Sequence, residues 1–244
     1  MLKKFLKKTK IPMHKAQETV LEIDLEALKH NFQYIKSLLK KDTKILAVVK
    51  AFAYGSEVNE VANFLQDLEV DYFAVAYVKE GVALRDAGIK TPILVLHPQP
   101  VNFQLLIERC LEPNLYSFKI LKEFIESSKA LNQKNYPVHI KFNTGLNRLG
   151  FREDDIEVLV SELNNTTSVK VKSLFSHLAA SEDLAEDSFT KGQIAMFSNI
   201  SEALTKHIGN RPIQHICNTS GVLNYTNAQF DMVIDPTQVR YISH

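Results

Sequence analysis

A lysine at the end of an apolar run is the first feature of this sequence that could do chemistry. Five apolar residues, Ile45 to Val49, lead directly into Lys50, and small residues and Tyr54 follow. A lysine ammonium is expensive to bury without a partner. A desolvated lysine has a lowered pKa and can form a Schiff base with a carbonyl compound. The run therefore indicates a nucleophilic lysine. The alternative is a lysine that only extends to solvent from a strand end.

Further polar side chains follow three later apolar runs. They are Lys141, Asn143 and Arg148 in and after 137–142, Ser176 and His177 after 169–175, and Asn218, Thr219 and Ser220 after 213–217. Cations and hydroxyls of this kind suit a phosphate, whereas no pair of histidines has the spacing of metal ligands. Taken singly, each has a structural interpretation. His177 could be a hydrogen-bonded core histidine, Arg148 a surface loop residue, and the segment 218–221 a turn.

The elements that would position these residues alternate between strand and helix. Strands are predicted at 18–24, 44–50, 72–76, 92–96, 111–116, 137–142, 169–175 and 213–217, with a further candidate at 230–234. Helices are predicted at 25–39, 59–68, 79–87, 102–110, 117–131, 154–163 and 188–206, with Asp24 and Ser117 as N-caps and Gly88 as a C-cap. From residue 45 on, repeated β-α units with strands buried on both faces require a parallel sheet.

The number of units predicts an α/β fold of the closed (β/α)8 TIM-barrel type, in preference to an open doubly wound sheet. No Gly-x-Gly occurs, so the dinucleotide fingerprint is absent. In a barrel, active-site residues lie at the C-terminal ends of the strands. The polar residues above are therefore expected to meet at one mouth.

Composition favours an ordinary globular protein. The chain has 244 residues, 45% of them hydrophobic, and a formal net charge of +1, which gives no general attraction to nucleic acid or membrane. Six lysines and no acidic residue lie within residues 1–15. Residues 1–17 are therefore predicted to be a basic tail or linker, with a nucleic-acid-binding arm as the alternative. Residues 18–244 are predicted to form the barrel.

Nothing in the sequence indicates a membrane or secreted location. No apolar run approaches the roughly 18 residues that span a bilayer, and the N-terminus lacks the apolar core of a secretory signal. The two cysteines, Cys110 and Cys217, are too few for a disulfide scaffold. We therefore expect a cytoplasmic protein with reduced thiols.

Four motifs resemble one known family. VVKAFAYG is similar to the VVKANAYG sequence of the alanine racemases, in which the lysine carries pyridoxal phosphate (PLP). KFNTGLNRLGF resembles their K-x-D-T-G-M-x-R-L-G-F, and FSHLAASED and HICNTSG resemble two further segments. Order and approximate spacing agree from about Thr19 to Val233. The chain is identified as a member of this family, similar to the racemase domain fused to a cell-wall peptide ligase in some bacteria.

The resemblance implies an interconversion of L-alanine and D-alanine, which supplies D-alanine for the cell wall. Lys50 would form the Schiff base and act as one of two bases at the α-carbon. Tyr54 and Thr219 would bind the cofactor phosphate, and Arg148 the cofactor's phenolic oxygen and the substrate carboxylate. His177 would lie at the pyridine ring, supported by neighbours such as Asn218 and His215. Lys141 matches a lysine that is carbamylated in some members.

The sequence departs from the family pattern at three places. Phe52 and Asn143 stand where most members have asparagine and aspartate. After Val233 the family has R-x-G-I, with an arginine at the pyridine nitrogen; here Ile234 takes the place of that arginine, and Pro236 has no N–H to offer a phosphate. The family's C-terminal β-domain, with its tyrosine base, is not present, and the last strand-helix unit is predicted to be incomplete.

Three interpretations follow. The chain could be a racemase barrel with weak activity alone, completed by a homodimer or by a separately supplied β-domain. It could be a stand-alone PLP-binding protein that maintains cofactor supply, or a structural domain that has lost the cofactor.

Overall fold

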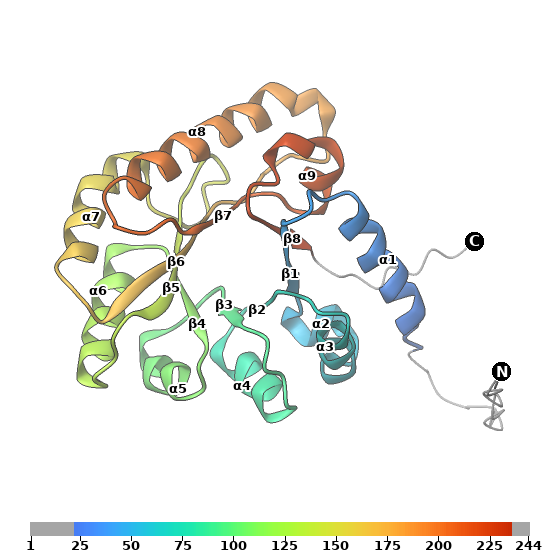
Figure 1. Cartoon of the computed structure of the whole chain (residues 1–244), viewed down its shortest axis with the longest axis horizontal. Coiled ribbons are helices and arrows are strands. Elements are labelled where there is room, and N and C mark those ends of the chain that lie inside the picture. The colour runs from blue at the N-terminus through green and yellow to red at the C-terminus, as the bar shows by residue number, and fades with distance from the viewer. Residues whose placement is uncertain (1–21, 236–244) are drawn as a thin grey trace.

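Eight parallel strands form one sheet that curls into a ring, with helices around its outside (Figure 1). The computed structural model describes residues 22–235. The strand order is β7-β6-β5-β4-β3-β2-β1-β8. The strands are β1 (Lys44–Val48), β2 (Tyr72–Val75), β3 (Ile93–Val95), β4 (Glu112–Leu115), β5 (Tyr136–Lys141), β6 (Val169–Phe175), β7 (Ile213–His215) and β8 (Met232–Asp235). The (β/α)8 barrel predicted from the sequence is confirmed.

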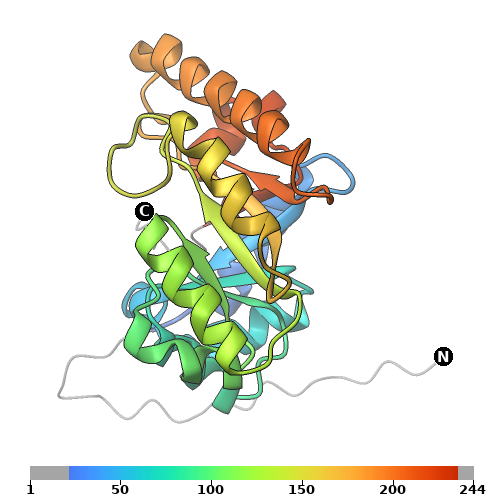
Figure 2. The same ribbon diagram turned by 90° about the vertical axis from the view of Figure 1, so that its left-hand side faces the viewer.

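Helices connect successive strands and cover the ring. They are α1 (Leu25–Ser37), α2 (Lys50–Gly55), α3 (Val58–Asp67), α4 (Val78–Asp86), α5 (Phe103–Glu108), α6 (Phe118–Ala130), α7 (Ile156–Asn164), α8 (Asp187–Thr205) and α9 (Thr219–Asn224). Short 3-10 turns are η1 (Pro100–Asn102), η2 (Glu153–Asp155), η3 (Leu184–Glu186) and η4 (Thr226–Ala228). From the side, α6, α7 and α8 form a layer outside β5 and β6 (Figure 2). No helix between residues 22 and 235 is long and apolar enough to cross a membrane.

The ring has one open seam, between β7 and β8, which are the two ends of the sheet. Two backbone hydrogen bonds cross it. The N–H of Asp231 donates to the carbonyl of Gln214 at 3.0 Å, and the N–H of Ile234 donates to the carbonyl of Cys217 at 2.8 Å. The barrel is therefore nearly closed, and its last two strands meet without a continuous ladder.

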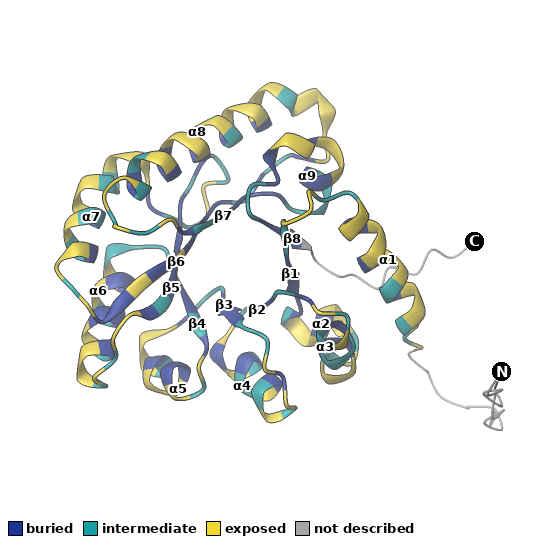
Figure 3. Cartoon of the chain, viewed as in Figure 1, coloured by how far each residue is buried: buried dark blue, intermediate teal, exposed yellow. Residues whose placement is uncertain are grey.

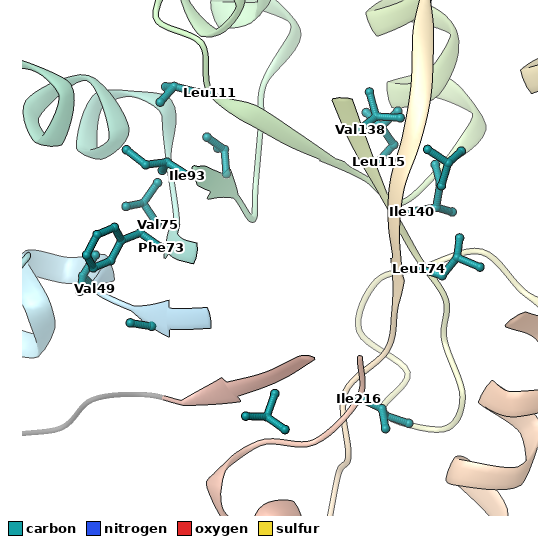
Figure 4. Packing of buried hydrophobic residues seen from close by; sticks show 14 of the residues in the cluster. Val49, Phe73, Val75, Ile93, Leu111, Leu115, Val138, Ile140, Leu174 and Ile216 are labelled. Atoms are coloured by element: carbon teal, nitrogen blue, oxygen red, sulfur yellow. The ribbon is translucent and has the colours of Figure 1, made fainter. Parts of the chain in front are cut away.

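Alternating side chains of the strands build two separate apolar layers. In β1, Ile45 and Ala47 join the large core between strands and helices, whereas Leu46 and Val48 point into the barrel with Met232 of β8. Figure 4 shows the outer layer, and Figure 3 shows that the strands are buried while the helices expose their outer faces. The prediction that this strand is buried on both faces is confirmed.

The elements differ from their sequence predictions mainly at their ends. Asp24 caps α1 as predicted, because its carboxylate accepts the N–H groups of Glu26 and Ala27 at 2.9 and 3.0 Å. The first barrel strand ends at Val48, so the predicted 44–50 strand is too long, and α9 was not predicted as a helix. The strand predicted at 18–24 is wrong for residues 22–24, which lie in no strand, and its remainder falls outside the described residues. The predicted tail at 1–17 and the incomplete unit after β8 also fall outside the described part of the chain.

Candidate functional site

A cavity of about 660 Å³ opens at the C-terminal ends of the strands. Residues from every part of the ring contribute to its wall. The lining residues are Leu46, Val48, Lys50, Tyr54, Ala74, Ala76, Tyr77, Leu96, His97, Asn114, Lys141, Arg148, Leu149, Phe175, His177, Asn218 and Ile234. A cavity of this volume at this end of a TIM barrel is the expected place for a small-molecule site.

Barrel closure brings nearly all the predicted site residues to this one cavity. The lining includes Lys50, Tyr54, Lys141, Arg148, His177 and Asn218. Thr219 does not line it and is the first residue of α9. The Asn218 side chain caps that helix by accepting the N–H of Gly221 at 2.9 Å, so part of its role is structural. The chemical roles assigned to these residues stay predictions.

Positive charge dominates the wall of the cavity. Lys141 is only 7% exposed, and burial lowers its pKa to about 8, with a further contribution from the charges of Arg148 and Lys50. Burial, together with the charges of Lys141, Arg148 and Lys50, also lowers the pKa of His177 to about 4. No carboxylate lines the cavity among the described residues. The site therefore favours an anionic ligand and a neutral imidazole at neutral pH.

Lys50 begins a turn of left-handed helix. The four residues Ala51 to Tyr54 have φ values of 52°, 55°, 51° and 59°, a conformation that costs an L-residue about 1–2 kcal/mol. Glu80 holds this turn in place. One of its oxygens accepts the N–H of Ala51 at 2.8 Å, and the other accepts the N–H groups of Ala76 and Tyr77 at 2.6 and 2.9 Å. The turn brings Tyr54 back beside Lys50, whose Nζ lies 5.9 Å from the centre of the tyrosine ring.

Arg148 lies on a loop whose two ends are tied together. The N–H of Asn143 donates to the carbonyl of Phe151, and the N–H of Phe151 donates to the carbonyl of Lys141, both at 2.8 Å. The Asn143 side-chain oxygen accepts the N–H groups of Gly145 and Asn147 at 3.2 and 2.9 Å. Asn143 therefore folds the loop from within, as an aspartate could.

A chain of buried polar side chains crosses the barrel below the cavity. Glu112 Oε2 lies 3.2 Å from the hydroxyl of Tyr72 and 2.7 Å from Nε2 of His139. Ser173 Oγ lies 2.6 Å from Nδ1 of His139 and 3.2 Å from Nε2 of His215. Burial and the charge of Glu112 raise the pKa of Tyr72, and burial lowers the pKa of His215 well below its usual range. This chain links β2, β4, β5, β6 and β7.

His215 supports the site from below. Its ring stacks on Phe175, with centroids 4.8 Å apart and planes within 2°. Phe175 in turn lines the cavity beneath Lys141. Among the described residues, Nδ1 of His215 has no hydrogen-bond partner. From the sequence, His215 is expected near His177, and the charge of His177 is among the causes that lower the pKa of His215.

Tyr77, His97 and Asn114 line the cavity without having been singled out in the sequence. His97 stacks on Tyr116, with centroids 5.6 Å apart, and meets Tyr77 edge to face at 5.8 Å. The Asn114 side chain donates to the carbonyl of Leu96 at 2.8 Å. Because they lie at the ends of β2, β3 and β4, the rule that active-site residues follow the strands of a barrel could have identified them from the sequence.

Within residues 22–235, no cluster of three or more histidine, cysteine or acidic side chains could hold a metal ion. The polar side chains that line the cavity are those of Lys50, Tyr54, Tyr77, His97, Asn114, Lys141, Arg148, His177 and Asn218.

Comparison with known families gives one match that covers most of the chain. The family described as "Alanine racemase, N-terminal domain" matches residues 23–233. The alanine racemase of Thermodesulfovibrio yellowstonii is 38% identical over 217 residues, which are 87% of this chain and 57% of that protein. Alanine racemase 1 of Caldanaerobacter subterraneus subsp. tengcongensis is 36% identical over 217 residues, 88% of this chain and 55% of that one. The chain thus spans about half the length of the curated relatives it matches.

Solved structures agree with this match. The alanine racemase of Corynebacterium glutamicum is 31% identical, with a TM-score of 0.80, over 88% of this chain and 60% of that one. The alanine racemase of Clostridium difficile 630 in complex with cycloserine is 28% identical, with a TM-score of 0.85, over 93% of this chain and 64% of that one.

Proposed function

We propose, starting from the fact that this chain belongs to the alanine racemase family, that its barrel binds pyridoxal phosphate through Lys50 and acts on the α-carbon of alanine. The observation that supports this most strongly is the cavity at the strand ends. There Lys50, Lys141 and Arg148 face one space without a carboxylate among its described lining residues.

The residues present fit the anionic groups of such a cofactor and substrate. A phosphate, a phenolate and an α-carboxylate are all negative, and cations in a partly buried cavity bind them more strongly than in water. Arg148 can bind a carboxylate with two parallel hydrogen bonds, because its guanidinium is planar and stays charged. Tyr54, whose ring centre lies 5.9 Å from Nζ of Lys50, adds a hydroxyl to the lining.

In the reaction, the protein binds and orients the cofactor and the substrate, and its side chains transfer protons. Bound pyridoxal phosphate supplies the electron sink that makes loss of the α-proton feasible. The amine of Lys50 accepts or returns that proton on one face of the substrate. Burial and the nearby cations lower the pKa of His177 to about 4, so at pH 7 its imidazole is neutral and would add no positive charge to the cavity.

Lys141 is the proposed site of carbamylation. Because the pKa of Lys141 is about 8, its side chain is a free amine in a substantial fraction of the molecules at mildly alkaline pH. That amine can attack carbon dioxide, which forms an N–C bond and releases one proton. The new carboxylate would sit among Lys50 and Arg148, and would orient the arginine by charge.

Binding without turnover is the second candidate function. Ile234 lines the cavity where the family resemblance places an arginine at the pyridine nitrogen. An apolar side chain there weakens the polarisation of the ring, which favours a PLP-binding protein over an efficient racemase. We further propose a cytoplasmic location and a homodimer, by analogy with the family.

Chemical trapping tests the proposal. The protein is incubated with pyridoxal phosphate, reduced with borohydride and mapped by peptide mass spectrometry, and the pyridoxyl group is expected on Lys50. Lys50→Ala should abolish the label, whereas Lys172→Ala, at an exposed position on β6, should retain it. Labelling of another lysine, or none at all, would refute the assignment.

A further inference from the structure

One glutamine of α8 contacts the loop that carries His177. Gln193 is 1% exposed, so both ends of its amide need partners inside the protein. Its Oε1 accepts the N–H of Ala179 at 3.0 Å, and its Nε2 donates to the carbonyl of His177 at 3.4 Å. One side chain therefore fixes two backbone groups of the segment that follows β6.

The same helix also packs against the loop that carries Arg148. Gly145 in that loop has a φ of +133°, and a Cβ added there would lie 3.0 Å from Cζ of Phe189 and 3.3 Å from Nε2 of Gln193. The first two turns of α8 thus fill the space beside this glycine. A shift of Gln193 would therefore displace both the loop that carries His177 and the loop that carries Arg148.

Side chains join the neighbouring loops directly as well. The hydroxyls of Thr144 and Ser176 lie 2.8 Å apart, and both residues are buried. The hydroxyl of Ser181 donates to Oδ1 of Asn218 at 2.7 Å. The loops after β5, β6 and β7 are therefore connected in series, with Gln193 bracing them from outside.

We propose that Gln193 is a positioning residue, which sets the relative placement of His177 and Arg148 at the cavity. The inference rests on the proposed function only in assuming that pyridoxal phosphate is what the cavity binds. It assigns Gln193 no contact with the ligand, because Gln193 does not line the cavity.

The chain contains a matched control. Gln229 is also 1% exposed, and its amide also bridges two backbone groups. It accepts the N–H of Lys40 at 3.0 Å and donates to the carbonyl of Leu38 at 2.9 Å. Gln229 lies outside the lining of the cavity and braces the segment after α1. Gln193→Met and Gln229→Met therefore remove the same chemistry from different places.

The first measurement is amide hydrogen exchange in ligand-free protein. Gln193→Met should speed exchange in residues 142–151 and 175–182, and most at Ala179, while Gln229→Met should leave both segments unchanged. Equal exchange of these segments in wild type and Gln193→Met would overturn the proposal. This measurement does not depend on what the cavity binds.

The second measurement is the dissociation constant of pyridoxal phosphate, which is determined from absorbance. It is made at a temperature at which both variants remain folded. Gln193→Met should weaken binding about tenfold, which corresponds to the free energy of about one hydrogen bond. Gln229→Met should weaken binding by less than about twofold. Equal weakening in the two variants would mean a general effect of stability and would overturn the proposal. If wild type binds no pyridoxal phosphate, the proposed function fails, and the exchange result alone decides the role of Gln193.

Should Gln193→Met not fold, Gln193→Asn replaces it. The shorter amide stays neutral but cannot reach both the N–H of Ala179 and the carbonyl of His177. Faster exchange at Ala179 together with weakened cofactor binding is then expected, and unchanged exchange and binding would contradict the proposal.

Discussion

Lys141 places its ammonium nitrogen 5.5 Å from the centre of the Phe175 ring. The face of an aromatic ring attracts a cation, although far less strongly than a carboxylate does. Burial and the nearby positive charges outweigh this attraction, which is why the pKa of Lys141 falls to about 8. The folded protein therefore holds this proton less tightly than the unfolded chain does.

This relationship predicts how stability depends on pH. Between about 8 and the ordinary value of 10.5, the unfolded chain binds more protons at Lys141 than the folded protein, so folding stability rises with pH in this window. The contribution is complete above 10.5 and is lost as pH falls through about 8. Its size is about 3 kcal/mol, at about 1.4 kcal/mol per pKa unit. Urea unfolding of wild type and Lys141→Met across this range should show the difference, and parallel curves would show that Lys141 has an ordinary pKa.

The left-handed turn predicts a stabilising substitution. Phe52 has a φ of 55° and a side chain that is 75% exposed, so it carries backbone strain while burying little. Asparagine tolerates this conformation better than phenylalanine. Phe52→Asn should raise stability by about 1 kcal/mol, or the melting temperature by about 2–4 °C.

Tyr34→Asn is the control for this substitution, since Tyr34 is an exposed aromatic residue in the right-handed helix α1. It should bring no gain. A loss of stability in Phe52→Asn would show that the ring makes a stabilising contact in solution.

Ile234 offers a test of why the family has an arginine at that position. Ile234→Arg should strengthen pyridoxal phosphate binding about tenfold, because a charge-assisted hydrogen bond contributes about 1.5–3 kcal/mol. The ligand-free variant should melt at a lower temperature than wild type, because Ile234 is 8% exposed and an arginine there is buried among other cations. Ile234→Met is the matched uncharged control. Equal dissociation constants for the two variants would remove the proposed role of the charge.

The 244-residue polypeptide alone should be a poor racemase. Racemisation needs proton removal on one face of the α-carbon and delivery on the other, and the proposed function gives Lys50 only one face. Two tyrosines lie near the C-terminal end of the sequence: Tyr225 is buried and does not line the cavity, and Tyr241 falls outside the described residues. Loss of one acid–base partner costs about 10²–10⁴-fold in rate.

The assay for this prediction is formation of D-alanine from L-alanine with excess pyridoxal phosphate, beside a full-length alanine racemase of the family. Turnover within a few-fold of the full-length enzyme would contradict it, and Tyr77→Phe would then test whether Tyr77, one of the two tyrosines that line the cavity, serves the second face.

The convergence of Lys50, Arg148 and His177 could be predicted because the barrel itself supplies it. Once strands are recognised from unbroken apolar runs, the segments that follow them are expected at the same end of the barrel. The turn that HICNTSG alone would suggest is instead the start of a short helix, which Asn218 caps and Thr219 begins; the phosphate-binding role of Thr219 stays a prediction.

Two features of the site could not have been read from local sequence patterns. Ala51 to Tyr54 contain no glycine, so nothing in their propensities indicates four successive left-handed residues; the contact with Glu80, 29 positions from Ala51, holds them. The chain through His139 and Ser173 depends on a register shift between Val138 and His139, which only the paired strands reveal.

The pairing of β1 with β8 bears on the order in which the barrel assembles. All the other hydrogen-bonded pairs in the sheet join strands that are consecutive in sequence, whereas β1 and β8 are the first and last strands. A contact beside that pair, between Lys40 and Gln229, spans 189 positions, and closing a loop of such length is slow. We therefore expect the β1–β8 pair to form last, from an open sheet on which Leu46, Val48 and Met232 are uncovered. The yield of folded protein then depends on how fast this closure proceeds relative to aggregation through that exposed inner face.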